Sequence, residues 1–263
     1  MHPPLDAARL AEALVAQGPY ARVEVVERID STNAELLRRA ATPAGPAHMT
    51  ALLAEHQTQG RGRQHPAEPA PRAWIAPPRT SLIASVLVKP PLEAAPRRTM
   101  LGLVWALAAA ETLDLLLPGQ AGLKWPNDLM LAGRKLAGVL AGGTGGGEVV
   151  VGIGLNVHQT EEELPDGRAG SVALAGAPDV DRTWLAIAVL SSAATWYERW
   201  ADGDPRLLGR AGERMAALGR LTRVALPDGQ TVAGLAEGLE ADGSLRLRLP
   251  DGSALAVGAG ELA

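Results

Sequence analysis

The chain has 263 residues, of which 47% are hydrophobic and 21% are charged, a balance that predicts a globular protein with one large domain and a small one. Its formal net charge of −4 argues against the basic face that nucleic-acid binding needs. The chain has no cysteine, which excludes disulfides and thiolate chemistry, and its five scattered histidines show no ligand spacing, so a zinc enzyme is not expected.

No segment of the sequence predicts a membrane span or a secretory leader. The longest apolar stretch, MLGLVWALAAA at residues 100–110, is much shorter than the roughly 20 residues that a bilayer requires. The N-terminus lacks a basic region followed by an apolar one. We therefore expect a cytoplasmic protein without a membrane partner.

Helical and strand patterns alternate through the first part of the chain. Residues 6–17 predict a short amphipathic helix that ends before a Gly-Pro pair. The segment ARVEVVERI alternates as a strand does, and the capping residues after it predict a helix that begins near Ser31 or Thr32. Two further strands, TALLAEHQ and SLIASVLVKP, flank a Gly-, Arg- and Pro-rich loop from Gly60 to Pro78.

The next part of the chain begins with a long helix at residues 95–117, which is apolar nearly all round and should therefore be buried. Four short strands follow as a meander: GLKWP, DLMLAG, RKLAGVLAGG and EVVVGIGLNV. A second long helix is predicted at residues 181–201. The fold class is therefore α+β, with a mixed β-sheet and packed helices.

The pattern changes from about Leu221 onward to short alternating runs. Asp-Gly pairs that begin at residues 228, 242 and 251 separate these runs, as in small antiparallel β-structures. We expect a small C-terminal SH3-like β-barrel. The boundary falls within residues 215–222, which gives a large domain at 1–217 and a C-terminal domain at 218–263.

Two rare residue types mark a candidate site. The chain has 22 arginines but only three lysines and three asparagines, as a GC-rich coding bias would give. Such a bias replaces lysine by arginine wherever only a positive charge matters, so the lysines and asparagines that remain are candidates for function. Two lysines and all three asparagines fall in four segments that we interpret as one site: IDSTNAELL, LKWPNDLML, GRKLAGVL and VGIGLNV.

The segment LKWPNDLML places Lys124, Asn127 and Asp128 together at the end of a strand, because its proline keeps the preceding residue extended and Asn-Asp favours a turn. Lysine can bind phosphate, asparagine can donate and accept hydrogen bonds, and aspartate can hold Mg²⁺. A hairpin turn with a structural salt bridge is the alternative interpretation of this segment.

Lys135 and Asn156 lie at the ends of neighbouring predicted strands. Small residues after Lys135 leave room for its ammonium group to reach a bound carboxylate or phosphate, and a solvated hairpin charge is the alternative. Gly152 and Gly154 indicate that a ligand or another backbone lies close to their strand. Asn156 at the end of that strand can hydrogen-bond phosphate or ribose oxygens.

The segment QTQGRGRQH is a candidate anion-binding loop, although it matches neither the dinucleotide fingerprint nor the P-loop. Gly60 and Gly62 allow successive N–H groups to form a nest, and Arg61 and Arg63 add positive charge. Such a loop can close over an anionic reactant, and an exposed, solvated loop is the alternative. The glycine-rich segment GGTGGGEVV has no basic residue and predicts only a loose hairpin.

Taken together, these segments resemble the biotin protein ligases. The resemblance rests on STNAELL, AEHQTQGRGR, LKWPNDLML, GRKLAGVLAG and VVVGIGLNV in this order and spacing, followed by GSVAL and a small β-domain, and it covers essentially the whole chain. It implies an ATP-dependent ligase that converts biotin to biotinyl-5′-AMP and transfers the biotinyl group to a lysine of a biotin carboxyl carrier domain. The substrates would be biotin and ATP with Mg²⁺.

The resemblance also implies residue roles within a catalytic domain at 1–217. Lys135 would bridge the biotin carboxylate and the α-phosphate, Arg61 and Arg63 would act with it over the adenylate, and Asp128 would hold Mg²⁺. The implied biotin-binding residues are Ser31, Thr32, Asn33, Gln57, Gly60, Arg61, Gly62, Arg63 and Lys135. The implied ATP-binding residues are Lys124, Asn127, Asp128 and Asn156. Homodimerisation is an expectation of the family.

Three features depart from the family pattern. The loop after Gly60 is longer and richer in proline than usual, and Arg72 and Trp74 are the equivalents we assign to the usual Gly-Arg-x-Trp segment. Arg79 stands where a glycine is common. The first expected strand begins at residue 21, which leaves too little chain before it for the helix-turn-helix domain that some members carry, so we expect no DNA binding.

Two alternatives stay open at this point. A lipoate or octanoate ligase shares the fold and the adenylate chemistry, although GRGR together with KWPND favours biotin. A non-catalytic nucleotide-binding module would bind ATP without releasing pyrophosphate, but it leaves the two clustered lysines unexplained.

Overall fold

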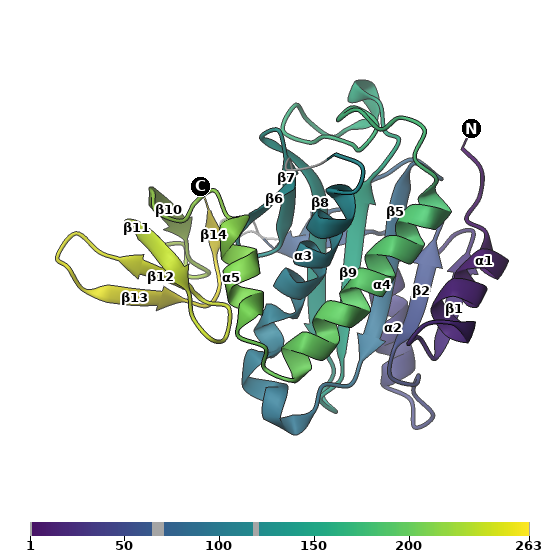
Figure 1. Cartoon of the computed structure of the whole chain (residues 1–263), viewed down its shortest axis with the longest axis horizontal. Helices are drawn as coiled ribbons and strands as arrows, with labels where there is room; N and C mark the ends of the chain where they lie inside the picture. The colour runs from purple at the N-terminus through teal and green to yellow at the C-terminus, as the bar shows by residue number, and fades with distance from the viewer. Residues whose placement is uncertain (1, 65–70, 118–120, 263) are drawn as a thin grey trace.

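A seven-stranded mixed sheet forms the centre of the large domain (Figure 1). The computed structural model describes residues 2–64, 71–117 and 121–262. Strands β1 and β2 are parallel, and the other neighbouring pairs of this sheet are antiparallel. The strands lie in the order β1 (Arg22–Val26), β2 (Thr50–Ala54), β5 (Ser81–Val88), β9 (Val149–Asn156), β8 (Arg134–Gly143), β7 (Asp128–Leu131) and β6 (Ala121–Lys124).

The two central strands, β5 and β9, are covered on both faces. They pair from Ser81 opposite Asn156 to Val88 opposite Val149, and every residue of β5 is buried. An unbroken apolar run is typical of a strand that packs on both sides, so the sequence pattern predicts these strands well. The expectation of a mixed sheet with packed helices is confirmed.

One face of the sheet carries most of the helices, and α3 and α4 cross it side by side in Figure 1. Fully buried side chains such as Trp105 of α3 and Leu190 of α4 belong to the main hydrophobic core on this side. The helical elements on this face are α1 (Ala7–Ala11), its π-helical continuation η1 (Glu12–Ala16), α3 (Leu101–Leu113) and α4 (Arg182–Ala201).

The opposite face is covered at one end by α2 (Thr32–Ala40). Leu36 of this helix packs in a separate buried cluster with Leu52 of β2, Leu87 of β5 and Val150 of β9. Ser31 caps the helix as the sequence predicts, since its side chain accepts a hydrogen bond from the Ala34 amide.

Next to α2, small residues line the same face of the sheet. Alternate residues of a strand share a face, so Ser85 of β5 and Gly152 and Gly154 of β9 lie in line with the α2 cluster. These residues are too small to fill the space above the sheet. The sequence therefore leaves a hollow next to α2.

Four segments differ from the prediction. The region Gly60 to Pro78, expected to be a loop, contains the antiparallel strands β3 (Arg61–Gln64) and β4 (Pro71–Ala73). The long helix expected at residues 95–117 begins as the 3₁₀-helix η2 (Leu92–Met100), which has Pro96 inside it, and α3 ends at Leu113. Proline cannot donate the backbone hydrogen bond that an α-helix needs there. Two short helices, η3 (Glu161–Glu163) and α5 (Arg206–Glu213), were not predicted from the sequence.

The C-terminal region forms a five-stranded antiparallel sheet rather than a closed barrel. The strands at its two edges, β13 and β14, do not pair with each other, so the expectation of closure is wrong. The predicted Asp-Gly turns are present, with φ values of 83, 85 and 84° at Gly229, Gly243 and Gly252. The order is β13 (Ala254–Val257), β12 (Leu245–Arg248), β11 (Thr231–Leu239), β10 (Leu221–Ala225) and β14 (Glu261–Leu262).

The small sheet is attached to the large domain near the KWPND segment. The indole of Trp125 donates a hydrogen bond to the Gly243 carbonyl at 3.1 Å, and the Thr99 hydroxyl donates to the Asp242 carbonyl at 2.7 Å. A turn of the C-terminal sheet is thereby fixed beside the strand end that the sequence analysis singled out. Among the helices described, none is long and apolar enough to cross a membrane.

Candidate active site

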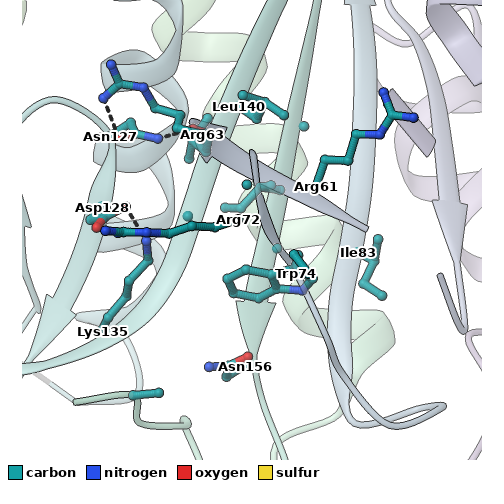
Figure 2. Close-up of a pocket in the computed structure, with 18 of the residues that line it drawn as sticks. Arg61, Arg63, Arg72, Trp74, Ile83, Asn127, Asp128, Lys135, Leu140 and Asn156 are labelled. Carbon is teal, nitrogen blue, oxygen red and sulfur yellow. Dashed lines mark hydrogen bonds and ion pairs between the residues drawn. The ribbon is translucent and has the colours of Figure 1, made fainter. Parts of the chain in front are cut away.

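A cavity of about 540 Å³ occupies the hollow beside α2, and Arg63, Arg72 and Trp74 line it from the β3–β4 hairpin (Figure 2). Gly60 does not line this cavity, but a Cβ atom there would lie only 2.3 Å from the Trp74 carbonyl oxygen, so only glycine fits. The structure brings the other predicted site residues to the cavity wall: Ser31, Thr32, Asn33, Gln57, Arg61, Gly62, Arg63, Lys124, Asn127, Asp128, Lys135 and Asn156.

Neutral donors and acceptors line the end of the cavity next to α2. The Thr32 amide and hydroxyl both donate to Gln57 Oε1, at 2.8 and 3.1 Å. The Asn33 side-chain amide donates to the Leu140 carbonyl at 2.9 Å. These bonds fix the side chains of Thr32, Asn33 and Gln57, and none of them involves a charged group.

Ser85 belongs to the same network, and the sequence analysis missed it. Its hydroxyl lies 2.6 Å from Thr32 Oγ1 and 2.6 Å from Asn33 Oδ1, so it connects the two α2 side chains. Ser85 is fully buried in β5 and lines the cavity. A hydroxyl inside the otherwise apolar run LIASVLV was the signal that could have revealed it.

The indole of Trp74 covers the glycine floor of the cavity. A Cβ atom on Gly154 would lie 2.5 Å from Trp74 Cε2, and one on Gly138 would lie 3.7 Å from Trp74 Cζ3. Among the described residues, the indole nitrogen is buried without a hydrogen-bond partner. Gly154 leaves room for an aromatic side chain, whereas the sequence pattern predicted a ligand or another backbone close to this strand.

Lys135 and Asp128 form an ion pair in the cavity wall, with 2.7 Å between Nζ and Oδ1 (Figure 2). The backbone of Lys135 is fixed as well, because its amide donates to the Arg168 carbonyl at 2.7 Å and its carbonyl accepts from the Gly170 amide at 2.9 Å. The lysine ammonium group is thus directed into the cavity beside a carboxylate.

Arg63 lies beside the KWPND turn. Its guanidinium is 3.4 Å from Asn127 Oδ1, and the Asn127 amide donates to the Val139 carbonyl of β8. Burial lowers the pKa of Arg63, whereas the charges of Asp128 and Glu261 raise it. A guanidinium keeps its proton in proteins, so this side chain is a fixed positive charge at the cavity wall.

Lys124 and Arg61 take different positions. Lys124 ends β6 directly opposite Asp128, which places a second lysine at the same strand end, as the sequence predicts. Arg61 also lines the cavity, but in Figure 2 its guanidinium points away from Lys135 and Arg63. The cationic groups that gather around Asp128 therefore do not include Arg61 in this conformation.

Asn156 is buried and already hydrogen-bonded. Its amide donates to the Gly170 carbonyl at 2.9 Å, and its Oδ1 accepts from Gln159 at 3.0 Å. Because Gly170 bonds the backbone of Lys135, Asn156 supports the segment beside that lysine. Direct contact between Asn156 and ATP stays a prediction.

Profiles of known families match both parts of the chain. One described as the biotin/lipoate A/B protein ligase family matches residues 25–158, and one described as the biotin protein ligase C-terminal domain matches residues 217–262.

Individual relatives agree with these profiles. The biotin–[acetyl-CoA-carboxylase] ligase of Mycobacterium tuberculosis is 36% identical over 100% of this chain and 96% of its own length. That of Paracoccus denitrificans is 35% identical over 87% of this chain and 95% of its own length. The structure of an Aquifex aeolicus biotin protein ligase in complex with biotin and ATP covers 93% of this chain and 98% of its own, with a TM-score of 0.74 and 25% identity. The chain therefore belongs to the biotin/lipoate A/B protein ligase family, and within that family it is a biotin protein ligase.

Proposed function

We propose that this enzyme activates biotin with ATP and passes the biotinyl group to a lysine of a biotin carboxyl carrier domain. The observation that carries the proposal is that one cavity joins a neutral hydrogen-bonding end to a cationic end. Biotin has the same division, since its ureido ring needs paired donors and acceptors and its carboxylate needs positive charge. The names of the relatives, which are biotin–[acetyl-CoA-carboxylase] ligases, support the same substrate and acceptor.

Biotin would bind with its ring at the α2 end. Ser31, Thr32 and Gln57 offer hydroxyl and amide groups there, and Asn33 packs so closely over Gly152 that a Cβ on that glycine would lie 2.1 Å from Asn33 Oδ1. A ring that replaces the existing bonds one for one leaves no buried polar group without a partner. The carboxylate would then extend toward Lys135.

ATP would bind at the cationic end, near Lys124, Asn127 and Arg63. A biotin carboxylate oxygen attacks the α-phosphorus, the bond to the bridging oxygen breaks, and pyrophosphate leaves with the electron pair. Negative charge builds on the α-phosphoryl oxygens during this step, and Lys135 and Arg63 are positioned to stabilise it. No enzyme nucleophile is needed, which agrees with a chain that lacks cysteine.

Mg²⁺ is the counterion we propose for the triphosphate. Among the described residues, no group of three or more His, Cys, Asp or Glu side chains could hold a metal by itself. Mg²⁺ commonly binds nucleotides through only one or two carboxylates, and Asp128 at the cationic end fits that mode. When bound, the ion would neutralise phosphate charge, while Lys135 remains the protein's own cation beside it.

The second half-reaction is attack of the acceptor lysine's uncharged ε-amine on the biotinyl carbonyl carbon, with loss of AMP and a proton to give an amide.

We further propose that the reaction takes place in the cytoplasm and that the chain forms homodimers without binding DNA. The net charge of −4 supports the absence of DNA binding. Size-exclusion chromatography and an electrophoretic mobility assay test these two properties.

Mass spectrometry of a purified carrier domain tests the function. The carrier is incubated with enzyme, ATP, Mg²⁺ and either biotin, lipoate or octanoate. With ATP present, we expect modification of one lysine by biotin and none by lipoate or octanoate. When ATP is omitted, we expect no modification. Modification with lipoate or octanoate but not with biotin would overturn the proposal in favour of the other branch of the family.

A further inference from the structure

The C-terminal strand reaches into the candidate active site. Glu261, the first residue of β14, lines the cavity, and its carboxylate lies 3.0 Å from the guanidinium of Arg72. The carbonyl of Gly260 accepts a hydrogen bond from Arg63 at 3.3 Å. Of these two adjacent residues, Gly260 therefore contacts Arg63 and Glu261 contacts Arg72.

The two arginines lie on opposite strands of the covering hairpin. Arg63 is in β3 and Arg72 is in β4, and these strands pair antiparallel with Arg61 opposite Ala73. Contacts from Gly260 and Glu261 thus reach both strands of one hairpin. A two-stranded hairpin is marginally stable by itself, so contacts outside the hairpin decide how firmly it lies over the cavity.

The position of Glu261 has a fixed support. β14 pairs with β10, with Ala225 opposite Glu261 and Val224 opposite Leu262, and Leu262 is buried. The sheet to which these strands belong is hydrogen-bonded to the large domain through Trp125. Gly260 and Glu261 are therefore fixed to the rest of the protein by the small sheet. Their contacts with Arg63 and Arg72 in turn hold the hairpin in place.

A carboxylate is an unexpected neighbour for an ATP site. Two like charges repel each other, so a glutamate in the cavity wall should by itself weaken the binding of a triphosphate or an adenylate. That cost is offset if the carboxylate holds an arginine that covers the ligand. The pairing of Glu261 with Arg72 fits this second role.

We propose that Gly260 and Glu261 form a clamp, here called the C-terminal clamp, that keeps the β3–β4 hairpin closed over the biotinyl-adenylate until an acceptor arrives. Glu261 is a positioning residue, which acts through Arg72 rather than on the reacting atoms. This inference rests on the proposed function. It predicts that loss of a negative charge beside an anionic ligand makes that ligand escape faster.

A chase experiment measures this escape directly. Enzyme is loaded with labelled biotin, ATP, Mg²⁺ and pyrophosphatase in the absence of acceptor, unlabelled biotin is added, and the protein-bound label is followed over time. Glu261→Gln removes the charge, Glu261→Lys reverses it, and Glu261→Asp keeps it. The control is Glu237→Gln, which breaks a 2.5 Å ion pair with Arg248 within the same small sheet.

We expect Glu261→Gln to lose bound adenylate about two- to fivefold faster than the wild type, as suits one part-exposed ion pair. Glu261→Lys should lose it faster still, because it repels Arg72, while Glu261→Asp and Glu237→Gln should resemble the wild type.

Two results would reject the clamp. One is escape at the wild-type rate in both Glu261→Gln and Glu261→Lys. The other is slower escape in Glu261→Lys, which would mean that Glu261 acts only by repelling the ligand. If the wild type itself forms no adenylate, the proposed function fails instead, so the two failures are distinguishable.

Discussion

The indole of Trp74 lies over Gly154 so closely that a single added carbon on the glycine would come within 2.5 Å of the ring. Trp74 comes from the covering hairpin and Gly154 from the central strand β9, so this contact sets how near the hairpin lies to the sheet. The indole therefore fills the space directly above this part of the sheet.

Gly154→Ala should push Trp74 away and reduce adenylate formation by tenfold or more. The added carbon meets three ring atoms within 3 Å, and overpacking of this kind costs about 1–3 kcal/mol. Gly145→Ala is the matched control, because a Cβ there meets nothing within 4 Å. Steady-state kinetics and thermal unfolding of both variants separate a local effect from loss of stability. Wild-type kinetics in Gly154→Ala would show that Trp74 does not cover the ligand.

Ser85→Ala should raise the KM for biotin several-fold and leave kcat nearly unchanged. The hydroxyl positions Thr32 and Asn33 at the neutral end of the cavity, and one hydrogen bond of this kind contributes about 1 kcal/mol. Titration of biotin at saturating ATP measures the effect, with the exposed Ser191→Ala as control. A change in the KM for ATP instead would place Ser85 at the wrong end of the cavity.

Arg79→Gly should stabilise the fold by about 1 kcal/mol, because a non-glycine residue in the left-handed region is strained. Arg79 has a φ of 64° at the position where a glycine was expected. Its side chain pairs with Glu27 at 2.8 Å, and that exposed contact contributes little. Arg79→Ala breaks the same ion pair but keeps the strained backbone conformation. The difference in the free energy of unfolding between the two variants, measured by chemical unfolding, therefore gives the cost of the strain. Equal stability of the two variants would contradict the strain.

Stability should fall as the pH drops below 6.5, in part because of His158. Burial chiefly, with the charges of His2 and Arg182, holds the pKa of His158 below its ordinary value of 6.5. Between the folded and unfolded pKa values the unfolded chain binds more protons, so acid favours unfolding in that window. His158→Gln should flatten the fall of Tm between pH 7 and pH 5. An identical slope in both proteins would mean that the protonation of His158 is not linked to folding.

The sequence predicted most of the fold, and nearly all of the site residues that it predicted line the cavity, for physical reasons that particular residues show. Unbroken apolar runs predicted β5 and β9, and the scarcity of lysine pointed to Lys124 and Lys135. Ser85 was missed because its environment depends on which face of β5 meets α2. That pairing is a tertiary property.

Long-range contacts explain the remaining differences. The strands β3 and β4 were not expected because glycine and proline dominate their segment, and they form by pairing with each other over the cavity. Nothing near Glu261 in the sequence indicates that it meets Arg72, which is 189 residues away. The open C-terminal sheet has the same explanation, since the turns predicted the strands but not which edges remain unpaired.

The central claim is that this cavity joins biotin to AMP beside Lys135. Biotin-dependent exchange of labelled pyrophosphate into ATP tests it most directly, in the wild type, in Lys135→Ala and in the exposed-lysine control Lys89→Ala. We predict exchange in the wild type and in Lys89→Ala, and a loss of about 10²–10³-fold in Lys135→Ala, as for removal of one group that stabilises transition-state charge. Exchange at a near-normal rate in Lys135→Ala, or none with biotin in the wild type, would contradict the account.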